Sequence, residues 1–262
     1  MPELPDLEVF RKNAFTRLSS KRLTGLTVFN TQKVLAPPKT LTDDLIGRDL
    51  LAINRIGKEL LFDFGDRSVI TAHLMLNGKM SIVGEDKVDA IGFKVFSMRF
   101  EHETIVFSDM GGLCTIKYMP LPDKAPDALD DGAFTWEYFS RVAKGKSRSN
   151  LKAFLIDQKV VKGIGNAYAD EILWDARISP HSVVGKIPEE KLKILYHAIG
   201  SVLTEAINSI KHISPDIISG EVRSFLKVHN RTRKETETGY PIIVEKIASK
   251  TTYYTEEQII YA

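Results

Sequence analysis

Residues 151–182 read LKAFLIDQKVVKGIGNAYADEILWDARISPHS. Apolar residues recur at helical spacing over Leu151–Ile156 and again over Asn166–Ala176, which predicts two short helices. The connection ends in Lys162-Gly163-Ile164-Gly165, whose glycines allow another backbone or a ligand to approach closely. The second helix would offer unpaired N–H groups to a phosphate, and Asn166 could cap this helix or bind the phosphate itself. The pattern alone also fits an ordinary helix cap without a ligand.

The helical pattern extends on both sides of this stretch. Further helices are predicted over Phe134–Ala143 and Glu189–Ile210, whereas residues 212–240 show no clear periodicity. Pro241–Lys246 and Thr252–Ile260 are predicted to form two strands around a tight turn. Upstream, residues 120–132 (PLPDKAPDALDDG) hold three prolines and four aspartates, a composition typical of a linker.

The N-terminal half has a different pattern. Residues 2–20 are predicted to form a helix, with Pro5 in its first turn and Asp6 and Glu8 near the positive end of the helix dipole. From about residue 23 to residue 120 the apolar period becomes two, which predicts short strands in a sandwich or barrel. The predicted strands are Leu23–Phe29, Leu50–Ile56, Leu60–Phe64, Val69–Leu76, Met80–Val83, Val95–Phe100, Ile105–Ser108 and Leu113–Met119.

Together the two patterns predict an α+β fold. An N-terminal β-sandwich domain with a leading helix is expected over residues 1–120, followed by a linker at 121–133. A helical domain would then span residues 134–225, and a terminal β-hairpin residues 226–262.

Composition excludes several classes of protein. Hydrophobic residues make up 43% of the 262 residues and the net charge is +2, so the chain is neither disordered as a whole nor a polycation. No apolar run reaches the roughly 18–20 residues of a membrane-spanning helix, and MPELPDLEVF carries acids where a signal peptide has cations. We therefore expect an intracellular, cytoplasmic protein. A single cysteine, Cys114, excludes an internal disulfide and a thiolate zinc site.

Basic residues cluster in two segments of the second half. Residues 141–162 contain seven Lys and Arg with one acid, and residues 223–234 contain five with no acid. Such uncompensated cations are typical of surfaces that bind polyanions. A basic surface that contacts only solvent is the alternative.

The N-terminus suggests a chemical role. A small second residue, Pro2, normally permits removal of Met1, which would expose a secondary amine with a pKa near ~8. Attack of this amine on a sugar C1′ would give a permanently cationic iminium, which can drive elimination of the 3′ phosphate. Glu3 lies beside it as a candidate general acid or base. An ordinary chain start is the alternative, and retention of Met1 would acylate the amine.

Four stretches carry a resemblance to a known family. MPELPDLEVF, Lys58 within RIGKELLFDF, AHLMLNG at 72–78 and the stretch 151–182 resemble, in this order, the formamidopyrimidine-DNA glycosylase / endonuclease VIII family. The resemblance implies that residues 134–225 form a helix–two-turn–helix DNA-binding domain. It implies a DNA glycosylase with lyase activity at abasic sites, which removes damaged bases in base excision repair and nicks the strand by β- or β,δ-elimination.

The resemblance also implies roles for individual residues. Pro2 would be the Schiff-base nucleophile, Glu3 the acid and base, and Lys58 a catalytic-site lysine that contacts phosphate near the lesion. The DNA-binding residues would be His73, Leu76, Lys152, Asn166 and Lys250. A half-buried histidine without a DNA contact is the alternative for His73. Glu171 is interpreted mainly as structural.

The chain departs from the family in its terminal hairpin. Most members end in a four-cysteine zinc finger with an arginine at the hairpin tip, and the cysteine positions fall here on Glu235, Thr238, Thr255 and Gln258. These side chains make a poor zinc site, so we expect a zincless finger, with no metal and no organic cofactor. Lys250 takes the arginine position and keeps the charge without the bidentate fork.

A second departure concerns the wedge that opens DNA. Leu76 takes the place of the family's methionine, but the arginine position falls on Gly111 or Gly112 and the aromatic position on Leu113. Flipping a base costs a few kcal/mol, so an enzyme without the polar plug should favour open DNA. The expected partner is damaged DNA, bound by a monomer without membrane association. One alternative is a lyase-only or purely DNA-binding member of the fold, and another is a structural interaction module.

Overall fold

The structure, a computed structural model, describes residues 1–120 and 124–262 and divides into two compact units. Unit 1 holds the chain up to the 121–123 gap together with Ile210–Glu221, and unit 2 holds Lys124–Ser209 and Val222–Ala262. The start of the predicted linker, residues 121–123, lies outside the described residues. Ile210–Glu221, expected in the helical domain, packs in unit 1, where the Asn13 amide donates to the carbonyls of Pro215 and Ile217 at 2.7 and 2.8 Å.

Unit 1 is the predicted β-sandwich with a leading helix, α1 (Leu4–Leu18). One sheet has the order β1 (Leu23–Val28), β7 (Lys94–Phe100), β8 (Glu103–Ser108) and β6 (Lys79–Val83). The other has the order β2 (Val34–Leu35), β9 (Thr115–Tyr118), β5 (Val69–His73), β4 (Glu59–Asp63) and β3 (Ala52–Ile56). The sequence did not predict β2, α2 (Pro38–Leu45) or the short η1 (Glu85–Lys87), because segments this short show no readable period.

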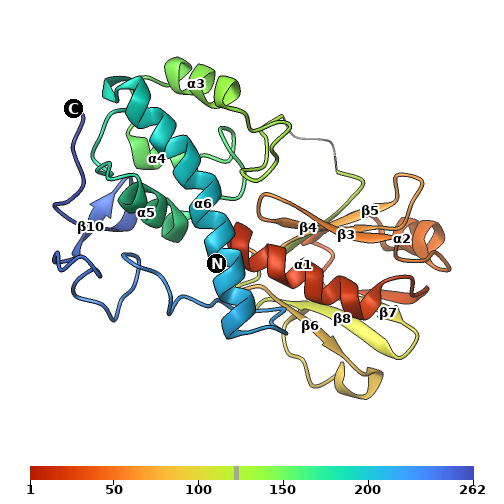
Figure 1. The fold of residues 1–262 in the computed structure, drawn as a ribbon. Coiled ribbons are helices and arrows are strands. Elements are labelled where there is room, and N and C mark those ends of the chain that lie inside the picture. The colour runs from red at the N-terminus through yellow and green to blue at the C-terminus, as the bar shows by residue number, and fades with distance from the viewer. Residues whose placement is uncertain (121–123) are drawn as a thin grey trace. The chain divides into compact units, whose positions relative to one another are not determined.

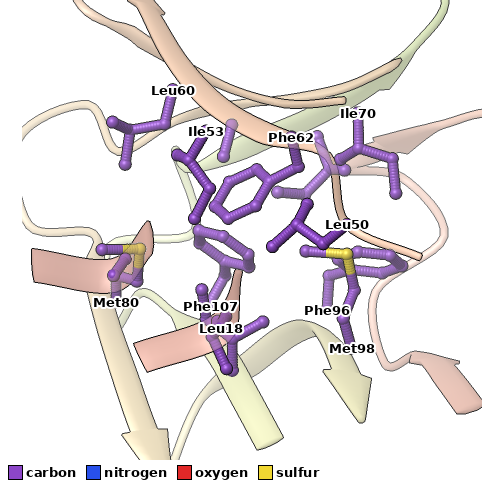
Figure 2. Packing of buried hydrophobic residues seen from close by; sticks show 14 of the residues in the cluster. Leu18, Leu50, Ile53, Leu60, Phe62, Ile70, Met80, Phe96, Met98 and Phe107 are labelled. Carbon is purple, nitrogen blue, oxygen red and sulfur yellow. The ribbon is translucent and has the colours of Figure 1, made fainter. Parts of the chain in front are cut away.

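The two sheets enclose an aromatic core. Phe62 of β4 and Phe107 of β8 meet edge to face, with ring centroids 5.7 Å apart, and Figure 2 shows them pointing toward each other. Helix α1 covers this core with Leu7, Phe10, Ala14 and Leu18. Close packing of this kind resists deformation, so it fixes the strand ends whose loops carry the site.

Unit 2 is helical and ends in a hairpin (Figure 1). Its elements are α3 (Trp136–Gly145), α4 (Leu151–Ile156), α5 (Asn166–Asp175), η2 (Val184–Lys186), α6 (Glu189–Ile213, whose end is grouped with unit 1), β10 (Ile243–Ile247) and β11 (Lys250–Tyr254). Helices α3 to α6 were predicted within three residues of their bounds. The hairpin was also predicted, but its second strand ends at Tyr254 and not at Ile260. Across the described ranges 1–120 and 124–262, no helix is both long and apolar enough to cross a bilayer.

Candidate functional site

The candidate nucleophile and its neighbour lie at the start of α1. Pro2 and Glu3 are both buried, and Glu3 is the N-cap of the helix in an extended conformation. The Asp6 carboxylate accepts a hydrogen bond from the Glu3 N–H at 2.9 Å, and the Met1 ammonium pairs with Glu221 within the same unit. The Asp6 contact fixes the start of α1 next to Pro2, whereas the Met1 contact is lost when Met1 is removed.

Lys58 lies on the tight turn between β3 and β4. Gly57 has φ +59° at the first central position of this two-residue turn, where glycine is favoured. Arg55 Nη1 donates to the Gly57 carbonyl at 3.1 Å, and Arg55 Nε lies 3.3 Å from Glu8 on α1. Thus the Glu8–Arg55 pair ties the turn that carries Lys58 to the helix that carries Pro2 and Glu3.

Glu8 is ionised in this arrangement. Burial acts to raise the pKa of Glu8, but the hydrogen bond from Arg11 and the charges of Arg11 and Arg55 outweigh it, so the pKa lies below its ordinary value. Arg11 Nε and Nη2 donate to the two oxygens of the Glu8 carboxylate at 2.9 and 2.6 Å. A charged Glu8 therefore holds Arg55 in position at neutral pH.

His73 ends β5 opposite Glu59, the residue that follows Lys58. The Met75 N–H donates to His73 Nδ1 at 3.0 Å, so the neutral ring carries its proton on Nε2. Burial lowers the pKa of His73, and the nearby charges of Lys58 and Lys117 lower it further against the opposing effect of Glu59. His73 is thus a neutral hydrogen-bond donor at pH 7, suited to a phosphate oxygen.

Leu76 follows on a tight loop and is exposed. The Gly78 N–H donates to the Leu74 carbonyl at 2.9 Å, and a Cβ at Gly78 would lie 2.1 Å from that oxygen. Only glycine fits there, and Met75 adopts φ +56°. The loop is therefore closely constrained, and it leaves the Leu76 side chain exposed.

Asn166 and Lys250 belong to one corner of unit 2. Asn166 is the first residue of α5, and its Nδ2 donates to the Thr251 carbonyl in the hairpin at 2.8 Å. Lys250 is exposed beside Thr251, directly after the turn residues Ala248 and Ser249, which both have positive φ. An amide has two N–H hydrogens, so Asn166 has a second hydrogen to donate besides the one that anchors the hairpin.

Lys152 does not fit its predicted role. Its side chain is 0% exposed and lies 2.7 Å from Asp170 Oδ1, and it donates to Thr252 Oγ1 at 2.6 Å. This burial contradicts the prediction that Lys152 contacts DNA. Asp170 also lies 2.7 Å from His229 Nδ1 and accepts from the Tyr253 N–H at 2.9 Å. Lys152 and Asp170 therefore join α4 and α5 to the hairpin.

Glu171 has the structural role that the sequence predicted. It is buried and accepts backbone hydrogen bonds from Lys227, Val228 and His229 at 2.6–2.9 Å. The segment that follows residue 222 is therefore held against α5.

Known proteins match this chain over most of its length. The sequence signature of the formamidopyrimidine-DNA glycosylase N-terminal domain matches residues 1–116, and that of the formamidopyrimidine-DNA glycosylase H2TH domain matches residues 125–216. The formamidopyrimidine-DNA glycosylase of Carboxydothermus hydrogenoformans is 29% identical over 97% of this chain and 98% of its own length. That of Lactococcus lactis subsp. lactis is 28% identical over 97% of each chain. The chain belongs to the formamidopyrimidine-DNA glycosylase family.

Solved structures of similar glycosylases agree in fold. A variant of the Lactococcus lactis enzyme bound to Fapy-dG-containing DNA has a TM-score of 0.85 at 25% identity, and covers 97% of this chain and 98% of that chain. MutM bound to DNA containing carbocyclic 8-oxo-G has a TM-score of 0.84 at 24% identity, with the same coverage. The predicted function is confirmed at the level of the family: this chain is a DNA glycosylase of base excision repair, in a family with glycosylase and lyase activity.

The zinc finger common in this glycosylase family does not fit the residues present here. Gln258 is already engaged, since its Oε1 accepts from the Thr255 N–H and its Nε2 donates to the Ile178 carbonyl, both at 2.9 Å. Threonine hydroxyls and a glutamine amide are poor ligands for zinc. Within the residues that the structure describes, no group of three or more His, Cys, Asp and Glu side chains could hold a metal ion.

A carboxylate, Glu257, joins two of the residues that take cysteine positions in this glycosylase. Glu257 Oε2 accepts from the hydroxyls of Thr238 and Thr255 at 2.8 and 3.1 Å, and from Trp174 Nε1 at 3.2 Å. Glu257 Oε1 accepts from Arg177 Nη1 at 2.5 Å. Burial acts to raise the pKa of Glu257, but these donors and the Arg177 charge lower it overall. The sequence pattern does not point to Glu257, because its hydrogen-bond donors come from separate segments of the chain.

We expect the hairpin of this glycosylase to be independent of metal. Metal analysis should find no stoichiometric zinc, and chelators should leave strand cleavage unchanged, because Glu257 with Thr238 and Thr255 closes the hairpin by hydrogen bonds. Glu257→Ala should weaken DNA binding about tenfold by loosening the hairpin, since five donors, Thr236 among them, lose their charged acceptor. Glu256→Ala is the matched control at a neighbouring acid and should leave DNA binding unchanged. One tightly bound zinc per chain would contradict this expectation.

Proposed function

We propose that this glycosylase excises a damaged base through the amine of Pro2 and then nicks the strand. The amine nitrogen attacks the sugar C1′, the C1′–N bond to the base breaks, and the departing base takes a proton. Glu3 acts as the acid and base for base departure and sugar opening. The iminium then withdraws electrons while a proton leaves C2′, and the C3′–O bond to the phosphate breaks in β-elimination. A second elimination can release the sugar.

One observation carries this proposal. Pro2 and Glu3 follow Met1 and lie at the capped start of α1, within the N-terminal region that matches the family. Since the nucleophile is an α-amine, the reaction needs no metal and no organic cofactor.

A second candidate function follows from the altered wedge. Gly111 or Gly112 stands where the family has an arginine, so the chain could act only on abasic sites, which need no base excision. Single-turnover cleavage of two matched DNAs, one with an intact oxidised purine and one with an abasic site, distinguishes the glycosylase from the lyase-only enzyme. Cleavage of both supports the glycosylase, whereas cleavage of the abasic DNA alone supports the lyase-only enzyme.

DNA binding rests on phosphate contacts. Lys58, His73, Asn166 and Lys250 supply cations or neutral donors, and the exposed Arg231, Arg233 and Lys234 add positive charge before the hairpin. Contacts of this kind position the DNA without reading its sequence. We propose a monomer that acts on damaged chromosomal DNA inside the cell.

Lys250→Ala and Asn166→Ala should each weaken binding of all DNA sequences about equally. Loss of the Lys250 charge should also reduce the slope of log K against log salt by about 1, because one fewer counterion is released. The Asn166 variant should keep the slope, since an amide carries no charge. Lys193→Ala, which removes an exposed cation from α6, serves as the control and should change neither quantity. A change in lesion preference at unchanged affinity would contradict the phosphate role.

A further inference from the structure

Three loops meet at one end of the four-stranded sheet of unit 1. Lys79 at the start of β6 and Lys94 at the start of β7 both pair with Ser108 at the end of β8. The loop with Leu76 precedes β6, Phe93 precedes β7, and residues 109–114 follow β8. The Asp109 N–H donates to the Phe93 carbonyl at 2.9 Å, and a Cβ at Gly111 would lie 3.3 Å from Asn77 Nδ2, so the loops are direct neighbours.

These loops expose large apolar side chains. Leu76 is 57% exposed, Phe93 66%, Met110 75% and Leu113 39%. Four such side chains on adjoining loops are unusual for a surface that contacts only water. We call Leu76, Phe93, Met110 and Leu113 the apolar edge.

Hydrogen bonds hold the loops of the apolar edge in place, and one of its residues has a strained backbone. The Asp109 carboxylate is buried and accepts from the N–H groups of Gly111, Leu113 and Cys114 at 2.6–2.8 Å. Phe93 adopts φ +53°, a conformation that bulky side chains rarely take. A strained, exposed aromatic contributes little to folding, and strain of this kind is concentrated at functional sites.

We infer that Phe93 and Met110 join Leu76 in the wedge that enters the base stack, with Phe93 stacking on a base that loses its neighbour. This inference rests on the proposed function. The exposed Lys79 beside the edge offers a cation to the phosphate backbone. Phe93 comes from a different loop than the aromatic position at Leu113, so it was not found from the sequence pattern. Stacking is tolerant of base identity, so cleavage of duplex DNA should depend little on the opposite base.

Phe93→Gly and Phe93→Tyr test this inference in single-turnover cleavage of one abasic site, placed in duplex and in single-stranded DNA. Phe93→Gly should lower duplex cleavage about tenfold and single-strand cleavage less than about twofold, because only the duplex needs the wedge. Phe93→Tyr should restore duplex cleavage. The thermal midpoint of Phe93→Gly should stay equal or rise, because glycine adopts positive φ without strain.

Matched controls keep the outcomes distinct. Leu35→Ala truncates another exposed apolar side chain of unit 1, on β2, and should leave the cleavage of both DNAs unchanged. Equal losses on both DNAs, unchanged duplex cleavage in Phe93→Gly, or a sharp dependence on the opposite base would each overturn the inference. Failure of the unaltered enzyme to cleave abasic DNA in either duplex or single-stranded form would instead contradict the proposed function.

Discussion

Pro2→Gly should lower strand cleavage by at least about 10³-fold while DNA affinity changes less than about twofold. A secondary amine gives an iminium that is always cationic, whereas the primary amine of glycine gives a neutral imine that must first gain a proton. Glycine also loses the ring that fixes the amine at the start of α1. Single-turnover cleavage of abasic DNA measures the rate, and titration of the same DNA measures the affinity.

Glu3→Gln serves as the companion variant. It keeps the shape of Glu3 and removes only its ability to exchange a proton, so base excision should fall by about 10²–10⁴-fold. Glu221→Gln is the control. It removes the charge that pairs with the Met1 ammonium, and this variant should cleave DNA at the normal rate once Met1 is removed. Unaltered cleavage by Pro2→Gly would exclude Pro2 as the nucleophile.

Lys152→Met should destabilise unit 2 by about 3–5 kcal/mol, because it leaves the buried Asp170 carboxylate without its cation. Both tryptophans of the chain, Trp136 and Trp174, belong to unit 2, so urea denaturation followed by tryptophan fluorescence reports its unfolding. Adding Asp170→Asn to Lys152→Met should recover part of the loss, since the buried charge is then removed.

Lys146→Met provides the matched control. It breaks the Lys146–Asp157 pair, which has a similar length of 2.6 Å but is partly exposed, and should cost less than about 1 kcal/mol. Equal losses for the two lysines would show that Lys152 contributes no more than a surface ion pair. If Lys152→Met left the stability unchanged and lowered the salt slope of DNA binding, the original prediction that Lys152 contacts a phosphate would be supported.

Local sequence patterns predicted the elements of this fold well, and the reason is physical. Period-two strands and amphipathic helices such as α1 and α6 bury one face. The spacing of their apolar residues can therefore be recognised within one short stretch of sequence. The Gly163–Asn166 turn is equally local, and its place at the start of α5 is confirmed. Short elements such as β2 and α2 were missed because they hold too few residues to show a period.

These local patterns could not predict which side chains pair in the folded structure. Lys152 lies in a basic run and was expected at the surface, but Asp170 is its partner across α4 and α5, and only packing brings them together. Glu257 was hidden because its donors come from separate segments of the chain. The sequence did not point to Phe93 for the same reason. The hydrogen bond from the Asp109 N–H to the Phe93 carbonyl, which positions Phe93, joins the start of β7 to the end of β8.

Borohydride trapping tests the central claim most directly. The enzyme is incubated with abasic DNA and sodium borohydride, the covalent complex is digested, and mass spectrometry locates the modified residue. We expect Met1 to be absent and the reduced sugar to be attached to the nitrogen of Pro2. An adduct on a lysine such as Lys58, or an intact Met1 in enzyme that cleaves at full rate, would contradict the assignment of Pro2 as the nucleophile.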